Sequence, residues 1–146
     1  MAEVSKEILM ACTTERLFDV LIDYAHYPEF VPGIKACRVL PGPGVRQVEY
    51  QLDIGFKRIT YVLRHLEQRP ARVSWSLVSG DALKVSNGSW ELTAEGAGTR
   101  ARYSVDIQIV KPALIPQGVI DKVTDELTRV QLPRTLDAFK SRAERA

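Results

Sequence analysis

The sequence predicts an α+β fold with an antiparallel sheet of about six to seven strands, two short helices after the first strand and one long C-terminal helix. Two observations predict it. Between Ile34 and Ile109, apolar residues recur at every second position in segments joined by short turns, which is typical of an antiparallel sheet with one solvent-exposed face. After Lys111, apolar residues recur at spacings of three and four, as on one face of a helix.

The chain has the length and composition of one globular domain. It has 146 residues with a net charge of +2, and 45% of them are hydrophobic, so we expect a single ligand-binding domain over residues 1–146. The charge is too balanced to require a nucleic-acid partner. No apolar run approaches the length of a membrane span, and the N-terminus lacks the pattern of a signal peptide, so we expect a cytoplasmic location. Transient membrane contact and the oligomeric state stay open.

The first part of the chain predicts a strand and a helix. Glu3–Ala11 has the pattern of a strand. Cys12–Glu15 then resembles a helix start, because a threonine hydroxyl can accept from the free amides of the first turn. One apolar stripe follows on this helix, at Leu17, Phe18, Leu21 and Ile22. We expect the helix to end between Asp23 and Ala25.

An aromatic segment, Asp23–Gly33, comes next. Pro28 suits a first helical turn, and Pro32 with Gly33 cannot continue one, so Tyr27–Gly33 is predicted to form a single helical turn. Its aromatic side chains are too numerous to leave in water. They are expected to be either core residues or part of the wall of a cavity.

The remaining segments follow in order. Strands are predicted at Ile34–Leu40, Gln47–Ile54, Lys57–Leu66, around Val73–Leu77, at Lys84–Ala94 and through Tyr103–Ile109, with turns at Pro41–Gly44, Arg69–Ala71, Ser79–Asp81 and Glu95–Gly98. The C-terminal helix carries an apolar stripe at Val119, Ile120, Val123, Leu127, Val130, Leu136, Phe139 and Ala143. Pro133 interrupts this stripe, which predicts a kink there. Pro112–Gly118 could be a gate or a rigid connector.

Three stretches resemble the START-like superfamily of helix-grip proteins, and most closely its coenzyme Q-binding and polyketide cyclase/dehydrase branch. They are Asp23–Pro32 with its Tyr-Pro-x-Phe-Val-Pro core, the hairpin formed by Gly88–Leu92 and Gly98–Tyr103, and Leu136–Lys140. The resemblance covers essentially the full length. It implies a curved sheet wrapped around the long helix, with an elongated apolar cavity between them. Some relatives in this branch are ribosome-associated.

The candidate cavity residues are apolar, aromatic or histidine side chains on the inner faces of these elements. They are Tyr24, Tyr27, Phe30, Tyr50, Tyr61, Leu63, His65, Trp75, Trp90, Tyr103, Val123 and Leu127. Each can equally be a core residue. A buried tyrosine or tryptophan needs a polar partner, which a ligand oxygen can supply.

No catalytic motif is visible in the sequence. His26 is expected to be partly exposed, and His65 has the parity of an inward-facing residue at the end of its strand. Neither histidine has an obvious carboxylate nearby in the sequence, so acid–base catalysis is unsupported. Cys12 and Cys37 stand alone, and a zinc site needs three or four ligands. We expect no metal and no cofactor.

Three functions are compatible with these observations. The first is a non-catalytic carrier of a hydrophobic small molecule, such as a polyprenyl quinone, a lipid or a polyketide-like aromatic compound. A cavity well below roughly 300 Å³ would argue against it. The second is a polyketide aromatase/cyclase or dehydrase, with Tyr50, Tyr61, Arg64 and His65 as candidate polar groups. The third is an interaction module of a ribosome or membrane complex.

The third function predicts a contiguous exposed patch. A locally basic region lies in the middle of the chain, at Lys57, Arg58, Arg64, Arg69 and Arg72. The alternation of strand residues divides these side chains between the two faces and the ends of the sheet. A continuous nucleic-acid-binding stripe is therefore not expected.

Overall fold

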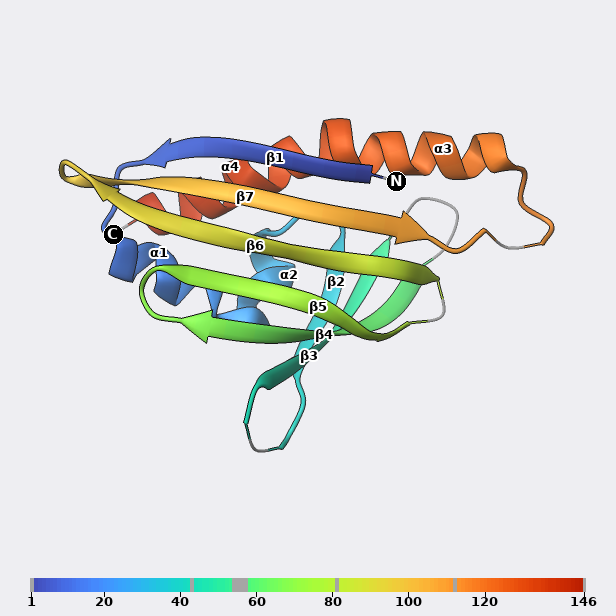
Figure 1. Ribbon diagram of the computed structural model, residues 1–146, viewed down its shortest axis with the longest axis horizontal. Helices are drawn as coiled ribbons and strands as arrows, with labels where there is room; N and C mark the ends of the chain where they lie inside the picture. The colour runs from blue at the N-terminus through green and yellow to red at the C-terminus, as the bar shows by residue number, and fades with distance from the viewer. Residues whose placement is uncertain (1, 43, 54–57, 81, 112, 146) are drawn as a thin grey trace.

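One antiparallel sheet and one long helix organise the molecule (Figure 1). The computed structural model describes residues 2–42, 44–53, 58–80, 82–111 and 113–145. The strands are β1 (Ala2–Met10), β2 (Ile34–Val39), β3 (Arg46–Asp53), β4 (Arg58–Gln68), β5 (Arg72–Gly80), β6 (Leu83–Glu95) and β7 (Gly98–Ile109). They pair in the order β1-β7-β6-β5-β4-β3-β2, and every pairing is antiparallel. The predicted α+β fold is confirmed.

Two short helical segments follow β1, as predicted. Helix α1 (Thr14–Leu21) begins after Thr13, whose side chain accepts a hydrogen bond from the Arg16 amide at 3.1 Å. This bond satisfies one of the free amides of the first turn. A 3-10 turn (Tyr24–His26) then leads directly into α2 (Tyr27–Phe30), where Pro28 occupies the first turn. The 3-10 turn and α2 place the aromatic segment next to β2, at the edge of the sheet.

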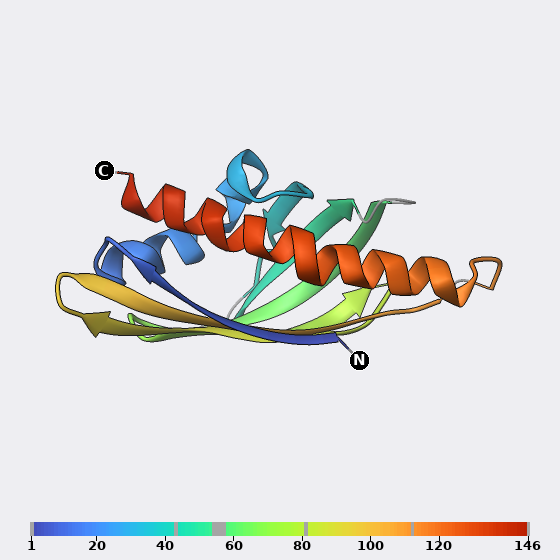
Figure 2. The same ribbon diagram turned by 90° about the horizontal axis from the view of Figure 1, so that it is seen from above.

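The long C-terminal helix spans residues 117–144 in three parts. They are α3 (Gln117–Asp125), a π-helical segment (Glu126–Gln131) and α4 (Leu132–Glu144). Pro133 lies in the first turn of α4. Because proline has no amide proton, the regular α-helical bonding pattern cannot run through it. Where the sequence predicted a kink, the structure has a π-helical segment just before the proline, and the helix runs on without a break (Figure 2).

The sheet curves around the long helix (Figure 2). Its concave face packs against α4 and against the two short helices. The core residues on that face include Val48, Tyr50, Ile59 and Trp90, and α4 adds Phe139; each is at most 4% exposed. The helix-grip architecture implied by the resemblance is therefore present.

Several predicted boundaries differ from the observed ones. β5 continues through Gly80, so Ser79 and Gly80 are strand residues where a turn was predicted. The pairing of Tyr61 with Gly80 explains this, because β4 and β5 are both long enough to extend the ladder to that point. Pro43, Ile54, Lys57, Asp81 and Pro112, which belong to the predicted turns, strands and connector, lie outside the described residues.

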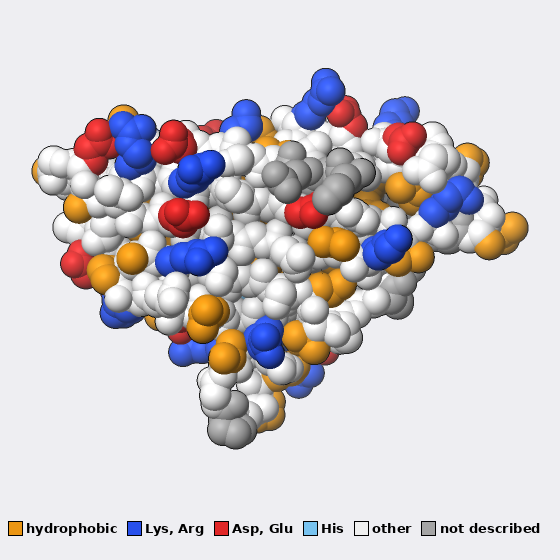
Figure 3. Space-filling model, viewed as in Figure 1, with side chains coloured by type: hydrophobic (Ala, Val, Ile, Leu, Met, Phe, Trp, Pro, Cys, Tyr) orange, Lys and Arg blue, Asp and Glu red, His pale blue; other side chains and the backbone are white. Residues whose placement is uncertain are grey.

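The convex face of the sheet carries charges of alternating sign. Arg72 pairs in register with Glu91, Glu91 with Arg102, and Arg102 with Glu7. Figure 3 shows blue and red side chains interspersed on this face. Opposite charges at directly facing positions stabilise neighbouring strands. In the part of the chain that the structure describes, no helix is both long and apolar enough to cross a membrane.

Candidate functional site

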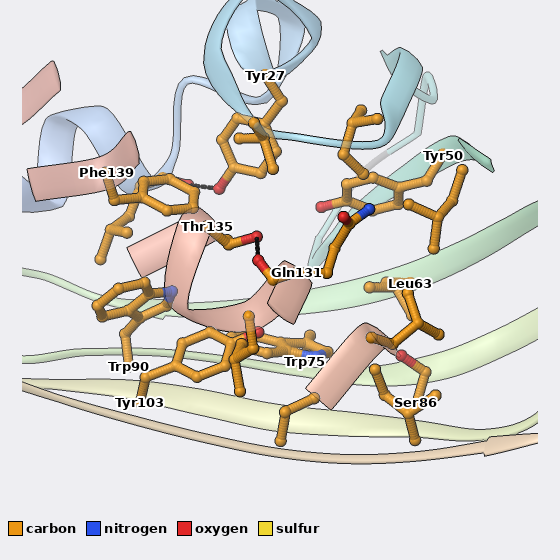
Figure 4. A pocket seen from close by; sticks show the side chains of 18 of the residues that line it. Tyr27, Tyr50, Leu63, Trp75, Ser86, Trp90, Tyr103, Gln131, Thr135 and Phe139 are labelled. Atoms are coloured by element: carbon orange, nitrogen blue, oxygen red, sulfur yellow. Dashed lines mark hydrogen bonds between the residues drawn. The ribbon is translucent and has the colours of Figure 1, made fainter. Parts of the chain in front are cut away.

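An internal cavity lies between the concave face of the sheet and the long helix (Figure 4). Its volume is about 150 Å³. β3, β4, β5, β6 and β7 supply one wall, the long helix supplies the opposite wall, and the segment around Tyr27 closes one side. The antiparallel strands place every second side chain on this face, which is why the period-two pattern of the sequence marks the lining.

Aromatic rings form much of the wall. Tyr50 and Tyr61 face each other across β3 and β4 and stack with their ring centroids 5.3 Å apart. Trp90 makes edge-on contacts with Tyr103 at 4.8 Å and with Phe139 at 5.4 Å. Edge-to-face and offset contacts of this kind hold rings in fixed orientations. The cavity therefore has rigid, mainly apolar walls.

Nine of the twelve candidate cavity residues line this space, and three do not. The nine are Tyr27, Tyr50, Tyr61, Leu63, His65, Trp75, Trp90, Tyr103 and Leu127. The three outside the lining are Tyr24, Phe30 and Val123. Tyr24 is fully buried, but its hydroxyl donates to Glu67 at 2.8 Å beyond the end of the cavity wall.

The aromatic segment is both core and wall. Tyr27 lines the cavity, and its hydroxyl donates to the carbonyl of Leu21, as the dashed line in Figure 4 marks. Its ring packs edge-on against Phe139, with centroids 5.3 Å apart. Phe30 contacts the same Phe139 ring, and the Arg142 guanidinium lies 5.0 Å from the Phe30 ring centroid. Tyr27 thus forms the wall, and Phe30 supports it from behind.

A buried hydrogen bond joins two lining residues, Tyr50 and His65. The Tyr50 hydroxyl lies 2.7 Å from His65 Nε2. His65 is only 5% exposed, and its Nδ1 is buried with no hydrogen-bond partner among the described residues. The Tyr24 ring lies 4.5 Å from the imidazole, measured between centroids. An inward-facing His65 was one of the two orientations that the sequence allowed.

The titratable groups of the cavity are neutral near pH 7. Desolvation, assisted by the positive charge of Arg46, lowers the pKa of His65 to about 3. Burial raises the pKa of Tyr27 and Tyr50 well above the usual value, and it also raises the pKa of Tyr61 and Tyr103. Low-dielectric surroundings disfavour the charged form in every case. No Asp, Glu, Lys or Arg is among the described residues that line the cavity.

The second histidine corrects one prediction from the sequence. His26 does have a carboxylate nearby in the sequence, because its Nδ1 lies 2.6 Å from Asp23. This contact raises the pKa of His26, with Glu29 contributing as well. A 3-10 turn has three residues per turn, so Asp23 and His26, three positions apart, lie on the same side of it. His26 is exposed, as predicted, and stands away from the cavity lining.

Several lining residues were missed from the sequence. The long helix contributes Gln131, Leu132, Thr135 and Phe139. Gln131 ends the π-helical segment, and the other three residues follow on α4. Pro133 was the available signal, because a proline inside a helical pattern marks such an irregularity.

Gly88 is a further missed residue. A Cβ atom placed on it would meet the Trp75 indole 2.5 Å away and would also meet the Ser104 carbonyl oxygen. Trp75 pairs with Gly88 across β5 and β6 and lines the cavity. A glycine within a strand marks such a close approach. Gly88 therefore allows Trp75 to lie flat against the sheet.

The rest of the described structure offers neither a metal site nor a second apolar cavity. Among the described residues, no group of three or more His, Cys, Asp or Glu side chains could hold a metal ion. A second hollow of about 540 Å³ lies at the surface between α3 and β7. It contains an ion pair between Asp125 and Arg129 with an N···O distance of 2.7 Å. Its lining is mostly polar, unlike the mainly aromatic and aliphatic wall of the internal cavity.

Comparison with solved structures places the fold among known relatives. The Zhui aromatase/cyclase from Streptomyces sp. R1128 superposes with a TM-score of 0.82 at 18% identity, covering 98% of this chain and 93% of that one. A START superfamily protein from Mycobacterium smegmatis gives a TM-score of 0.78 at 20% identity and covers 97% of both chains. These likenesses concern the fold.

Comparison of sequences gives a relative and a family. The ribosome association toxin RatA from Vibrio cholerae is 26% identical over 99% of this chain and 96% of its own length. The family model described as polyketide cyclase/dehydrase and lipid transport matches residues 1–144. With that match over nearly the whole length, and with a helix-grip fold that encloses an aromatic cavity, the chain belongs to the polyketide cyclase/dehydrase and lipid transport family.

Proposed function

We propose that this protein binds and carries a compact, neutral, hydrophobic small molecule in its internal cavity, without converting it chemically. The observation that carries the proposal is the lining itself. It is predominantly aromatic and aliphatic, and its described residues include no charged side chain. Such a lining favours an apolar ligand, because a charged group would be desolvated there without a partner.

The cavity volume lies well below the roughly 300 Å³ named above, so it counts against a carrier of a large molecule such as a polyprenyl quinone and leaves only a compact ligand. Common ligand sites start at roughly 300 Å³, and this cavity has about 150 Å³. An apolar cavity of about 150 Å³ is known to accommodate a benzene ring. A whole polyprenyl quinone is therefore too large to be enclosed in this conformation. A ligand of one or two rings fits, and a longer tail would have to extend through an opening.

The protonation states favour binding over proton transfer. A general acid or base works best when its pKa lies near the working pH. The pKa of His65 is lowered to about 3, and the lining tyrosines have pKa values raised above their usual range. These groups can donate or accept hydrogen bonds at pH 7, but they exchange protons poorly. This argues for a carrier rather than a cyclase or dehydrase.

Native mass spectrometry tests the proposal. The purified protein is measured intact, and any bound compound is then extracted and identified, with Ser86→Phe as the comparison. Ser86 is 6% exposed and lines the cavity, so a phenyl ring at this position fills the space. A ring compound that is present in the wild type and absent from Ser86→Phe supports the proposal. The same adduct on both proteins contradicts binding in the cavity.

Ribosome association is a second candidate function. The observation that favours it is the match to RatA over essentially the full length of both chains. The convex face of the sheet argues against rRNA binding there, because Arg72, Glu91 and Arg102 alternate in sign across it. Sedimentation through a sucrose gradient distinguishes the two candidates. Comigration of the Ser86→Phe variant with ribosomal subunits would support an interaction that does not need the cavity.

A further inference from the structure

We propose that Tyr50 and His65 form a hydrogen-bonding centre that recognises an acceptor oxygen, such as a ring ketone, on the ligand. This inference rests on the proposed function and names the chemistry of its ligand. The two side chains come from neighbouring strands, β3 and β4, and both line the cavity. Figure 4 shows Tyr50 projecting from its strand toward the space between sheet and helix.

The hydrogen-bonded pair of Tyr50 and His65 has one more donor than it can use internally. A neutral imidazole carries one N–H, and a tyrosine carries one O–H, so the pair has two donors. Only one of them is used in the bond of 2.7 Å between Tyr50 and His65 Nε2. The remaining donor is either Nδ1–H of His65 or the hydroxyl of Tyr50, depending on the tautomer. Either way the buried pair keeps one spare donor and needs an acceptor from elsewhere.

The surroundings favour the tautomer in which Nε2–H donates to the Tyr50 oxygen. His65 Nδ1 is buried and has no partner among the described residues. A proton on Nδ1 would therefore find no acceptor among the described residues, whereas the Tyr50 hydroxyl belongs to the cavity lining, where a ligand oxygen can accept its proton. A bare lone pair at Nδ1 is also compatible with the nearby positive charge of Arg46, which acts on this imidazole. The Tyr50 proton is then free to turn toward a ligand oxygen.

The pair is held rigidly in place. The Tyr50 ring stacks on Tyr61 with an interplanar angle of 14°. The imidazole is enclosed by Tyr24 and Trp75, with ring centroids at 4.5 and 6.1 Å. Because the free protein already fixes both groups, a ligand loses little entropy in ordering them. The donor therefore has a defined direction before the ligand binds.

The rest of the lining points to the same ligand chemistry. Among the described residues, the hydroxyls of Tyr61 and Tyr103 have no recorded hydrogen bond, and they add further donors. The described lining residues include no lysine or arginine, so a carboxylate or phosphate would find no charged partner among them. The ligand that fits is a neutral ring compound with a carbonyl or ether oxygen, rather than a fatty acid or a phosphorylated lipid.

Calorimetric titration at pH 7 with three compact probes tests the inference. 1-Indanone has an acceptor oxygen, indane is its hydrocarbon counterpart, and indole has only a donor. The wild type is expected to bind 1-indanone about 3- to 10-fold more tightly than indane, which is the range for one hydrogen bond. Tyr50→Phe is expected to lower this ratio toward one. The matched control is Tyr24→Phe. The Tyr24 hydroxyl donates to Glu67 outside the cavity lining, so its removal should leave the preference for 1-indanone over indane unchanged.

The outcomes separate this inference from the proposed function. Indane binding with no preference for 1-indanone, or an unchanged ratio in Tyr50→Phe, overturns the inference and leaves the carrier proposal standing. Tightest binding of indole also overturns it. No binding of any probe by the wild type overturns both. If Tyr50→Phe does not fold, ¹⁵N NMR of the wild-type histidines decides instead: a proton on Nε2 of His65 supports the inference, and a proton on Nδ1 contradicts it.

Discussion

The α-carbon of Gly33 packs directly against the side-chain amide of Gln131. Gly33 ends the aromatic segment, and Gln131 ends the π-helical segment, so residues that are far apart in the sequence meet beside the cavity. A Cβ atom on Gly33 would collide with Gln131 Nε2 and would lie 3.1 Å from a methyl carbon of Leu52. An alanine at this position would therefore have to displace the amide end of the Gln131 side chain.

Gly33→Ala is expected to lower the free energy of unfolding by more than the cost of placing alanine in a left-handed backbone conformation. Gly33 has φ +82°, and Gly44 has φ +83° with no atom near its would-be Cβ. The left-handed conformation costs about 1–2 kcal/mol for alanine at either position. Gly33→Ala must also displace Gln131. Denaturant unfolding should show a larger loss for Gly33→Ala than for Gly44→Ala, and equal losses would contradict the contact.

Gly88→Ala and Gly118→Ala are expected to change stability in opposite directions. At Gly88 the added methyl group meets the Trp75 indole and the Ser104 carbonyl, and such overpacking costs about 1–3 kcal/mol. At Gly118, within α3, no atom lies within 4 Å, and alanine favours the helix by up to about 1 kcal/mol. Thermal unfolding checks both signs. Tryptophan fluorescence, which reports Trp75 together with Trp90, should shift only in Gly88→Ala, and a shift in both variants would argue against the contact between Gly88 and Trp75.

Phe139→Ala is expected to destabilise the protein by about 3–5 kcal/mol and to enlarge the cavity. Phe139 is 3% exposed and contacts Tyr27, Phe30 and Trp90. Leu114→Ala is the control, because Leu114 is 95% exposed and its loss should change the free energy of unfolding by less than about 0.5 kcal/mol. At a temperature where Phe139→Ala remains folded, calorimetry should show binding of a larger ring system than the wild type accepts.

His65 is expected to make the protein less stable at mildly acidic pH. Its pKa is about 3 in the folded protein and about 6.5 when unfolded, so between these values the unfolded chain binds more protons. Stability therefore falls as pH drops through 6.5, and the loss levels off below about pH 3. Between pH 7 and pH 5 the expected loss is about 2 kcal/mol.

The control for this pH effect is His65→Gln, which retains His26. The raised pKa of His26 acts in the opposite direction, because the folded protein then binds its proton more tightly. Denaturant unfolding at pH 7 and pH 5 should show a smaller loss in His65→Gln than in the wild type. An equal loss in both proteins would show that His65 is protonated in the folded state at pH 5.

Much of the fold followed from local patterns. The alternation in β3 and β4 identified which side chains face inward, so Tyr50, Tyr61 and His65 could be named from their parity. The proline-rich end of the aromatic segment likewise predicted α2. These elements were predictable because their periodicity is a property of neighbouring residues.

The parts that were missed depend on contacts between distant segments. Tyr24 was assigned to the cavity, but its partner Glu67 lies on β4 and could not be known from the local sequence. Gln131 and Thr135 line the cavity from the long helix, but their side chains are polar and so did not belong to the apolar stripe that marked its inner face. Asp23 contacts His26 through a 3-10 turn, which the local sequence pattern did not predict.

Methyl NMR of the wild type during titration with 1-indanone tests the central claim most directly, namely that the internal cavity binds a small hydrophobic ring. Leu63, Val73 and Leu132 line the cavity, whereas Leu66 and Leu114 are exposed. The methyl resonances of Leu63, Val73 and Leu132 are predicted to shift saturably, and those of Leu66 and Leu114 are predicted to stay unchanged. The absence of saturable shifts at the lining residues, or shifts confined to the exposed leucines, would contradict it.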